Sequence, residues 1–280
     1  MTPSPQEIGA LLRLLDDDTP GIQQRIAERL AATGGDLSEY LAHGEITLNP
    51  RQAFLLTEIL QPLRRETLAS EWIAPSNYAA GLNDDWETFE AMLRMVSDFL
   101  HDGLTVRQSL GDAIDLLAEE ADSAGVQSEH ALAQFLFAKS LLRPAAPSQF
   151  CPAIYDLSWG IAHGLGNRLT LCLIYALVAR RLDFDVAILR HQEAFFPRYH
   201  HHGHSEIIDC AMRGESIENI SSLDSVRNRL LVCRNSCLGE LMLDFLAELK
   251  REYDRLARTE DSELIERLIR SLCPSNGYLS

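Results

Sequence analysis

The chain has 280 residues, of which 46% are apolar and 24% are charged, the usual balance of a globular protein. Aspartate and glutamate number 41 against 25 lysines and arginines, so the formal charge is −16. This charge argues against nucleic acids and anionic membranes as partners, because both attract basic surfaces. We expect a protein or peptide partner, and the sequence does not identify it.

The first residues, Met1 to Glu7, have neither a basic region nor a long apolar stretch, so they do not resemble a signal peptide. We therefore expect a cytoplasmic protein. Six cysteines in 280 residues are too few for a disulfide scaffold, and no CxxC pair indicates a zinc ribbon or a thioredoxin-like motif. Two of them, Cys233 and Cys237, lie four apart on a predicted helix, and we interpret both as reduced structural thiols.

Helices are predicted throughout the first half of the chain. Residues 6–33 read as a helix pair around the acidic turn Asp16-Asp17-Asp18, followed by shorter helices. The turn reads as a solvated helix end. Apolar residues at helical spacing predict further helices, with Phe135 and Phe137 in the core. The predicted ranges are 36–43, 50–74, 86–100, 105–121 and 128–142.

The most apolar segment runs from Gly166 to Leu182. Gly166 and Asn167 are a plausible turn and N-cap, and in the eleven residues Leu169 to Ala179 only Thr170 is clearly polar. Apolar side chains on every face predict a fully buried helix, which is too short to cross a bilayer.

The spacing of the apolar residues changes from a helical to a strand-like period after this helix. Residues 186–190, 194–199 and 206–210 read as strands of an antiparallel meander packed on the buried helix, and Pro197 suggests an edge strand or a bulge. Helices are predicted again over 230–256 and 261–272. The fold class is therefore α+β, mostly α, and we divide the chain into a helical region 1–84, a core 85–225 and a C-terminal helical hairpin 226–280.

The buried helix and the strands after it resemble the bacterial transglutaminase-like proteins of the Sir-B type. The motif-grade match covers about 166–216 and the acidic turn is similar but less diagnostic. The resemblance implies a papain-like core between helical flanks, the last of them repeat-like. The matching segments are Gly166 to Leu182, Asp183-Phe184, Ala194-Phe195, Arg198-Tyr199, Ile207-Ile208-Asp209 and Gly214-Glu215-Ser216.

The resemblance also implies where a catalytic triad would lie. Transglutaminase chemistry needs a cysteine thiolate at the helix N-terminus, a histidine in the next strand and a carboxylate that orients the histidine. In register with the family, these positions hold Arg168, Ala194 and Asp209. Only the third residue keeps the required type, so we interpret the chain as a diverged member without acyl-transfer chemistry.

Two alternatives remain open from the sequence. Cys172 lies one helical turn beyond Arg168 and would act as nucleophile with His191 or His163 in a cryptic cysteine hydrolase or acyltransferase. However, Cys172 lies among apolar residues, and His191 is an odd number of residues before Ala194. In a regular strand that offset places the two on opposite faces.

The second alternative is a metal site in the polar turn that contains His200, His201, His202 and His204. Imidazole suits zinc, nickel and copper, and His200, His202 and His204 are the candidate ligands. The competing interpretation is a solvated hairpin tip whose histidines become charged below about pH 6.5. The favoured function is a non-enzymatic protein-interaction or regulatory module that uses the degenerate cleft or the helical surfaces.

Overall fold

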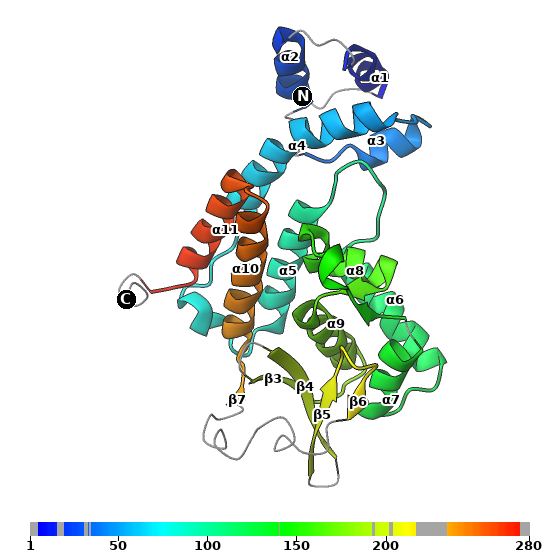
Figure 1. The fold of residues 1–280 in the computed structure, drawn as a ribbon, viewed down its shortest axis with the longest axis vertical. Coiled ribbons are helices and arrows are strands. Elements are labelled where there is room, and N and C mark those ends of the chain that lie inside the picture. The colour runs from blue at the N-terminus through cyan, green and yellow to red at the C-terminus, as the bar shows by residue number, and fades with distance from the viewer. Residues whose placement is uncertain are drawn as a thin grey trace. The chain divides into compact units, whose positions relative to one another are not determined.

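The computed structural model describes residues 5–15, 20–30, 33, 35–139, 141–191, 194–201, 204–216 and 234–274. The described residues are mostly helical with one small sheet, so the predicted α+β, mostly α class is confirmed (Figure 1). The chain forms two compact units, Met1–Ile73 with Asp98–Arg107, and Ala74–Ser97 with Gln108–Ser280. The predicted division at residues 84 and 225 stays a prediction about domains.

The first unit is helical, as the sequence predicts. Its longest helix begins at Pro50 because Asn49 and Gln52 form a capping box and proline is favoured at the first helical position. Leucines and isoleucines from four helices form its core. Residues 16–19 of the acidic turn lie outside the described residues. The helices are α1 (Pro5–Leu14), α2 (Pro20–Leu30), α3 (Ser38–His43) and α4 (Pro50–Glu71).

The second unit contains the remaining elements, and the unit boundary falls within α5. The helical elements are η2 (Tyr78–Leu82), α5 (Trp86–Leu100), α6 (Leu110–Ser123), α7 (Glu129–Ala133), the π-turn η3 (Gln134–Ala138), η4 (Pro147–Gln149), η5 (Pro152–Tyr155), α8 (Leu157–His163), α9 (Arg168–Arg181), α10 (Leu238–Arg255) and α11 (Thr259–Ser271). The strands are β1 (Arg143–Pro144), β2 (Leu165–Gly166), β3 (Val186–His191), β4 (Ala194–His201), β5 (His204–Asp209), β6 (Glu215–Ser216) and β7 (Arg234–Asn235).

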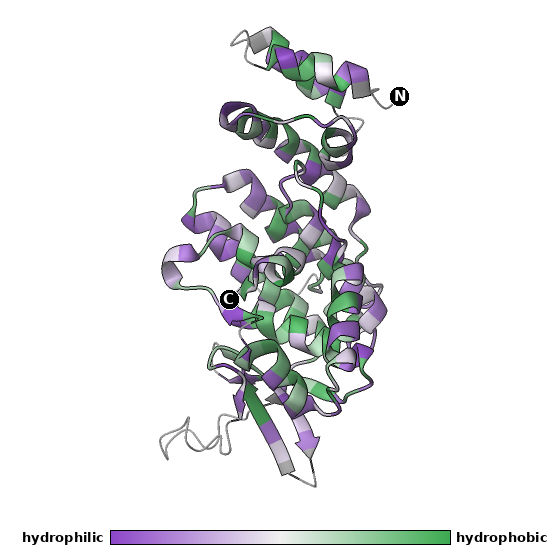
Figure 2. Ribbon diagram, turned by 90° about the vertical axis from the view of Figure 1, so that its right-hand side faces the viewer, coloured by the Kyte–Doolittle hydropathy of each residue, from purple (hydrophilic) through white to green (hydrophobic). Residues whose placement is uncertain are grey.

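Helix α9 is the centre of this unit, and its predicted burial is confirmed. Asn167 caps the helix by accepting a hydrogen bond from the Thr170 amide at 2.7 Å. All residues from Leu169 to Ala179 are buried. Helices α6, α7 and α8 and strands β3 and β4 pack around it, so every face of the helix meets another element. Figure 2 shows hydrophobic residues where the strands meet the helix and more hydrophilic ones toward the far end of the β4–β5 hairpin.

The sheet has the strand order β6-β5-β4-β3-β7, and each pair of adjacent strands is antiparallel. The predicted meander is therefore confirmed. The edge assignment suggested by Pro197 is wrong, because β4 lies in the interior of the sheet. Pro197 pairs with Ile188 of β3, and the pairing of β4 with β5 starts one residue later, at Arg198. The missing N–H of proline therefore falls just outside the β4–β5 ladder.

Several predicted helix boundaries are wrong for local reasons. Helix α6 begins at Leu110 rather than at residue 105, because Ser109 caps it by accepting from the Asp112 amide at 3.2 Å. The helix predicted over 128–142 ends in the π-turn η3. Helix α10 begins at Leu238, so Cys237 is its N-cap residue rather than a helical one, and Cys233 lies outside the described residues.

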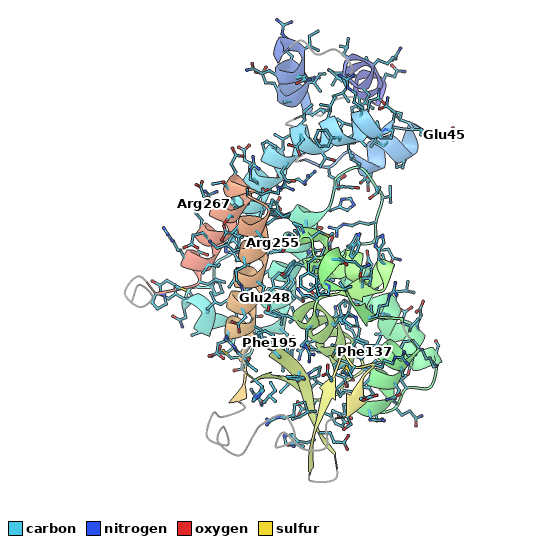
Figure 3. All side chains as sticks on the ribbon, in the orientation of Figure 1. Glu45, Phe137, Phe195, Glu248, Arg255 and Arg267 are labelled. Carbon is cyan, nitrogen blue, oxygen red and sulfur yellow. The ribbon has the colours of Figure 1, made fainter. Side chains whose placement is uncertain are left out.

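Both predicted core aromatics are buried. Phe137 stacks on Tyr175 of α9 with ring centroids 6.1 Å apart, and Phe135 is also in the core. Figure 3 labels Phe137 and, on β4, Phe195. Within the described ranges, no helix has the length and apolar character needed to span a membrane.

Candidate functional site

The three positions of the expected triad meet at the N-terminus of α9. Arg168 is the first residue of this helix, and its Nη1 donates a hydrogen bond to Asp209 Oδ1 at 2.9 Å. The guanidinium carbon of Arg168 lies 4.9 Å from the centre of the Phe196 ring, within the range of a cation–π contact. The side chains of Arg168 and Asp209 are 33% and 12% exposed, so the ion pair is largely shielded from water.

Asp209 is held rigidly where β5 ends. Its Oδ1 also accepts from the Ala211 amide at 2.9 Å, and its carbonyl oxygen accepts from the amides of Met212 and Gly214. Gly214 has a φ of 71°, which glycine adopts without strain, and an added Cβ there would crowd the Ala133 carbonyl at 2.8 Å. The tight turn therefore fixes the carboxylate that Arg168 binds.

Ala194 is the first residue of β4 and pairs directly with His191, the last residue of β3. Directly paired residues in antiparallel strands point to the same face of the sheet. The expectation that His191 and Ala194 occupy opposite faces is therefore wrong, because the chain reverses between them. Ala194 packs with Leu189, Phe196 and Ile207, and alternation along β5 places Asp209 on the same face as Ile207.

His191 thus lies beside the position that the family gives to its catalytic histidine. His191 is 8% exposed. An odd offset in sequence separates faces only along a continuous strand, and the two-residue spacing between 191 and 194 is typical of a hairpin. The site face therefore carries an imidazole, a carboxylate and a guanidinium, and the Arg168 position holds no nucleophile.

Cys172 lies inside the core rather than at a cleft. It is fully buried, and its thiol donates to the Phe195 carbonyl at 3.2 Å. Its sulfur lies 3.8 Å from that of Cys210, which is also buried. Burial, together with the neighbouring Cys172 thiol, raises the pKa of Cys210 well above its ordinary value. Both thiols are buried away from any substrate, and the protonated form that burial favours at Cys210 is a poor nucleophile.

His163 belongs to a separate local arrangement. It is the last residue of α8, where its Nδ1 donates to the Trp159 carbonyl at 2.9 Å. Its ring stacks on the Trp159 indole with centroids 4.2 Å apart. These contacts fix the imidazole on its own helix.

The histidine-rich turn is described only in part. His200 Nδ1 lies 3.1 Å from Ser205 Oγ, within hydrogen-bond distance. His202 and the side chains of His201 and His204 lie outside the described residues. Among the residues that the structure describes, no group of three or more histidine, cysteine, aspartate or glutamate side chains has the arrangement of a metal site. The metal site at His200, His202 and His204 stays a prediction.

The arrangement at α9 has the geometry of a binding site for charged groups rather than of a nucleophile. Arginine has five donors and no acceptor, and it stays protonated at physiological pH. Sequence reasoning found Arg168, Ala194 and Asp209 but missed Phe196, which lies under the guanidinium, and Cys210, which contacts Cys172. The aromatic residue two positions after Ala194, on the same strand face, is the signal that identifies Phe196.

The comparisons with known proteins concern the family of the chain. No curated protein and no solved structure matches the sequence. The sequence model of the transglutaminase-like superfamily matches residues 105–270, which is more than half of the chain and includes α9, the sheet and the described C-terminal helices almost to their end. The chain therefore belongs to the transglutaminase-like superfamily.

Proposed function

We propose that this protein is a pseudoenzyme of the superfamily that acts as a protein-interaction or regulatory module through its degenerate site. The observation that carries the proposal is the ion pair between Arg168 and Asp209. In a working triad the carboxylate orients a histidine, which in turn activates a thiol. Here the carboxylate is bound by the residue that replaces the thiol.

Charge and exposure at the site support a binding role. Arg168 remains one third exposed after pairing with Asp209, so part of its guanidinium faces solvent. A planar guanidinium is suited to bind a carboxylate of a partner peptide through paired hydrogen bonds, and the buried ring of Phe196 packs against the guanidinium. We further propose that the chain is a Sir-B type member of the superfamily that has lost the catalytic cysteine and histidine.

Thiol labelling tests the proposed loss of chemistry. The native protein is treated with iodoacetamide at pH 7, and mass spectrometry follows the rate at each cysteine. We expect no cysteine of the wild-type protein to react faster than a free thiol. A cysteine that reacts as a thiolate near neutral pH would contradict the pseudoenzyme proposal.

Restoring the two missing residues provides the matched positive control. In the double variant Arg168→Cys, Ala194→His, we expect one fast-labelling thiol, because the helix N-terminus and the histidine lower its pKa. At pH 7 the thiolate fraction rises from about 3% at a pKa of about 8.5 to about half at a pKa near 7, so the reactive thiolate increases about sixteenfold. Each single variant separates the contribution of the helix from that of the histidine.

Peptide display tests the binding role. Peptides selected on the immobilised wild-type protein are measured against Arg168→Ala, Asp209→Asn and the control Arg251→Ala, which removes an exposed arginine on α10. We expect about tenfold or greater loss of affinity with Arg168→Ala and none with the control. Equal binding to all variants would exclude the degenerate site as the interaction surface.

A further inference from the structure

A polar pocket lies at the C-terminal end of α9, within the second unit. It has a volume of about 400 Å³ and is formed by α5, the start of α6 and the last residues of α9. Helix α9 has 14 residues, so at about 1.5 Å per residue this pocket is about 20 Å from Arg168 along the helix. The lining residues are Trp86, Glu87, Glu90, Ala91, Arg94, Gly111, Arg180 and Arg181.

Arg181 forms a fixed part of this pocket. Its two terminal nitrogens donate to both carboxylate oxygens of Glu90, at 2.8 and 2.6 Å, and its Nε donates to Asp115 at 2.7 Å. The hydrogen bond from Arg181 to Glu90 raises the pKa of the guanidinium, although burial opposes this shift. The ion pairs join α5, α6 and α9, and they use both oxygens of Glu90.

Two other arginines of the pocket have no acidic partner within the described part of the chain. Arg94 lies four residues after Glu90 on α5, the spacing of a helical ion pair, but Arg181 already occupies Glu90. Arg94 and Arg180 form no ion pair with any residue that the structure describes, and both are exposed. Arg94 and Arg180 therefore present two positive charges at one pocket of a chain whose formal charge is −16.

The ring of Trp86 positions one of them. The guanidinium carbon of Arg180 lies 5.3 Å from the Trp86 ring centre. Trp86 is in turn held by an edge contact with Phe89, with centroids 5.8 Å apart, and Phe89 is fully buried. Arg180 is therefore ordered before any ligand binds, which lowers the entropy cost of binding.

The start of α6 adds to the positive character of the pocket. Gly111 is the second residue of this helix, where backbone N–H groups have no partner within the helix and the helix dipole favours anions. An added Cβ at Gly111 would contact only Ser109 Oγ, at 4.0 Å, so the space above this turn is open.

We propose that this pocket binds a small anionic ligand whose phosphate or carboxylate group is held by Arg94 and Arg180. A guanidinium forms paired hydrogen bonds with either group, so the structure defines the shared anionic chemistry. Glu87 lines the same pocket and is suited to accept a hydrogen bond from a hydroxyl or amino group elsewhere on the ligand. The site is independent of the degenerate triad positions.

Calorimetry and fluorescence on the full chain test this assignment. Inorganic phosphate and malonate are titrated separately at constant ionic strength, with chloride as the background anion. We expect saturable binding of at least one of them and a change in Trp86 emission, because the anion offsets the positive charge of Arg180 beside the indole. Phosphate alone would indicate a phosphorylated ligand, malonate alone a carboxylate ligand, and both a general anion site.

Variants locate the binding. Arg94→Ala and Arg180→Ala should each weaken it about tenfold, whereas Arg251→Ala, which removes the same charge elsewhere, should not change it. Trp86→Phe should keep the binding heat and lose the emission change. Gly111→Glu adds a carboxylate in the open space at a helix N-terminus, where it is tolerated, and should abolish binding.

Two results would overturn the proposal. The first is the absence of saturable binding of both anions to the wild-type protein. The second is binding that persists in Arg94→Ala, Arg180→Ala and Gly111→Glu. Because Gly111→Glu removes no arginine and no core contact, its result remains interpretable even if an arginine variant folds poorly.

Discussion

The ion pair between Arg168 and Asp209 gives the most direct test of the site as described. In Arg168→Met the aliphatic stem is kept and the charge is lost. In the native protein the Asp209 side chain is 12% exposed, and in the variant its carboxylate retains the hydrogen bond from the Ala211 amide. The variant therefore leaves a largely buried carboxylate without its counter-ion.

The expected loss of stability lies between two limits. Removing one partner of a fully buried pair costs about 3–5 kcal/mol, and an exposed pair contributes about 0–1 kcal/mol. Since Arg168 is one third exposed, an intermediate cost of about 2 kcal/mol is expected. Losing the contact with Phe196 destabilises the variant by about 0.5–1 kcal/mol, and removing a cation from a helix N-terminus stabilises it by about the same amount, so the two effects nearly cancel.

A double-mutant cycle measures the pair itself. Asp209→Asn keeps an acceptor for the Ala211 amide while removing the charge, so the double variant Arg168→Met, Asp209→Asn contains neither unpaired charge. We expect it to be more stable than the sum of the single changes by about 1–2 kcal/mol. Urea unfolding in a Trp72→Phe background follows the remaining tryptophans, Trp86 and Trp159, which belong to the second unit.

The result that would refute this reasoning is additivity. If the coupling is below about 0.3 kcal/mol and Arg168→Met leaves the unfolding midpoint unchanged, the two side chains do not form a stabilising pair in solution. In a thermal scan the expected loss corresponds to a midpoint about 4–8 °C lower for a unit of this size.

Three further outcomes follow from the packing of the second unit. The thiols of Cys172 and Cys210 should react with a disulfide reagent only after unfolding, and fast reaction in native buffer would show that the core opens at α9. Burial raises the pKa of Tyr155 to about 12, so the stability that the buried neutral phenol contributes is complete below pH 10 and is lost as the pH rises to about 12. Tyr155→Phe should flatten the fall in the free energy of unfolding over this range. An unchanged slope of the free energy of unfolding against pH would argue against the shift. Gly239→Ala should cost more than about 2 kcal/mol in urea unfolding, because a Cβ at this position would collide with the Ala79 carbonyl oxygen, and a neutral effect would mean that η2 moves freely away from α10.

The sequence predicts the central part of the fold well because its signals are local. The apolar run from Leu169 to Ala179 has one structural solution, a buried helix, and the alternating segments after it have one, a sheet. The start of α6 was misplaced because residues 105–109 contain one apolar residue, Val106, so apolar spacing does not define where the helix begins, whereas Ser109 caps it before Leu110. Capping depends on side-chain hydrogen bonds that periodicity does not detect.

The candidate site was only partly predictable because its contacts are distant in sequence. Arg168 and Asp209 are 41 residues apart, and their opposite charges at two motif positions were the only local indication that they pair. His191 and Ala194 lie on the same face of the sheet because the chain reverses between them. The alternation rule used for the prediction applies only within one continuous strand. Among the described residues Arg94 has no acidic partner because Arg181 binds Glu90, its neighbour on the helix, and this depends on the packing of three helices.

The burial of α9 also determines where this protein can change over evolution. Each residue from Leu169 to Ala179 is buried, so most substitutions there would cost stability before they altered any activity. The two ends of the helix are less constrained, and both carry arginines that are partly exposed, Arg168 at one end and Arg180 at the other. New chemistry and new ligands can therefore be acquired or lost at the helix ends while the interior continues to specify the same fold.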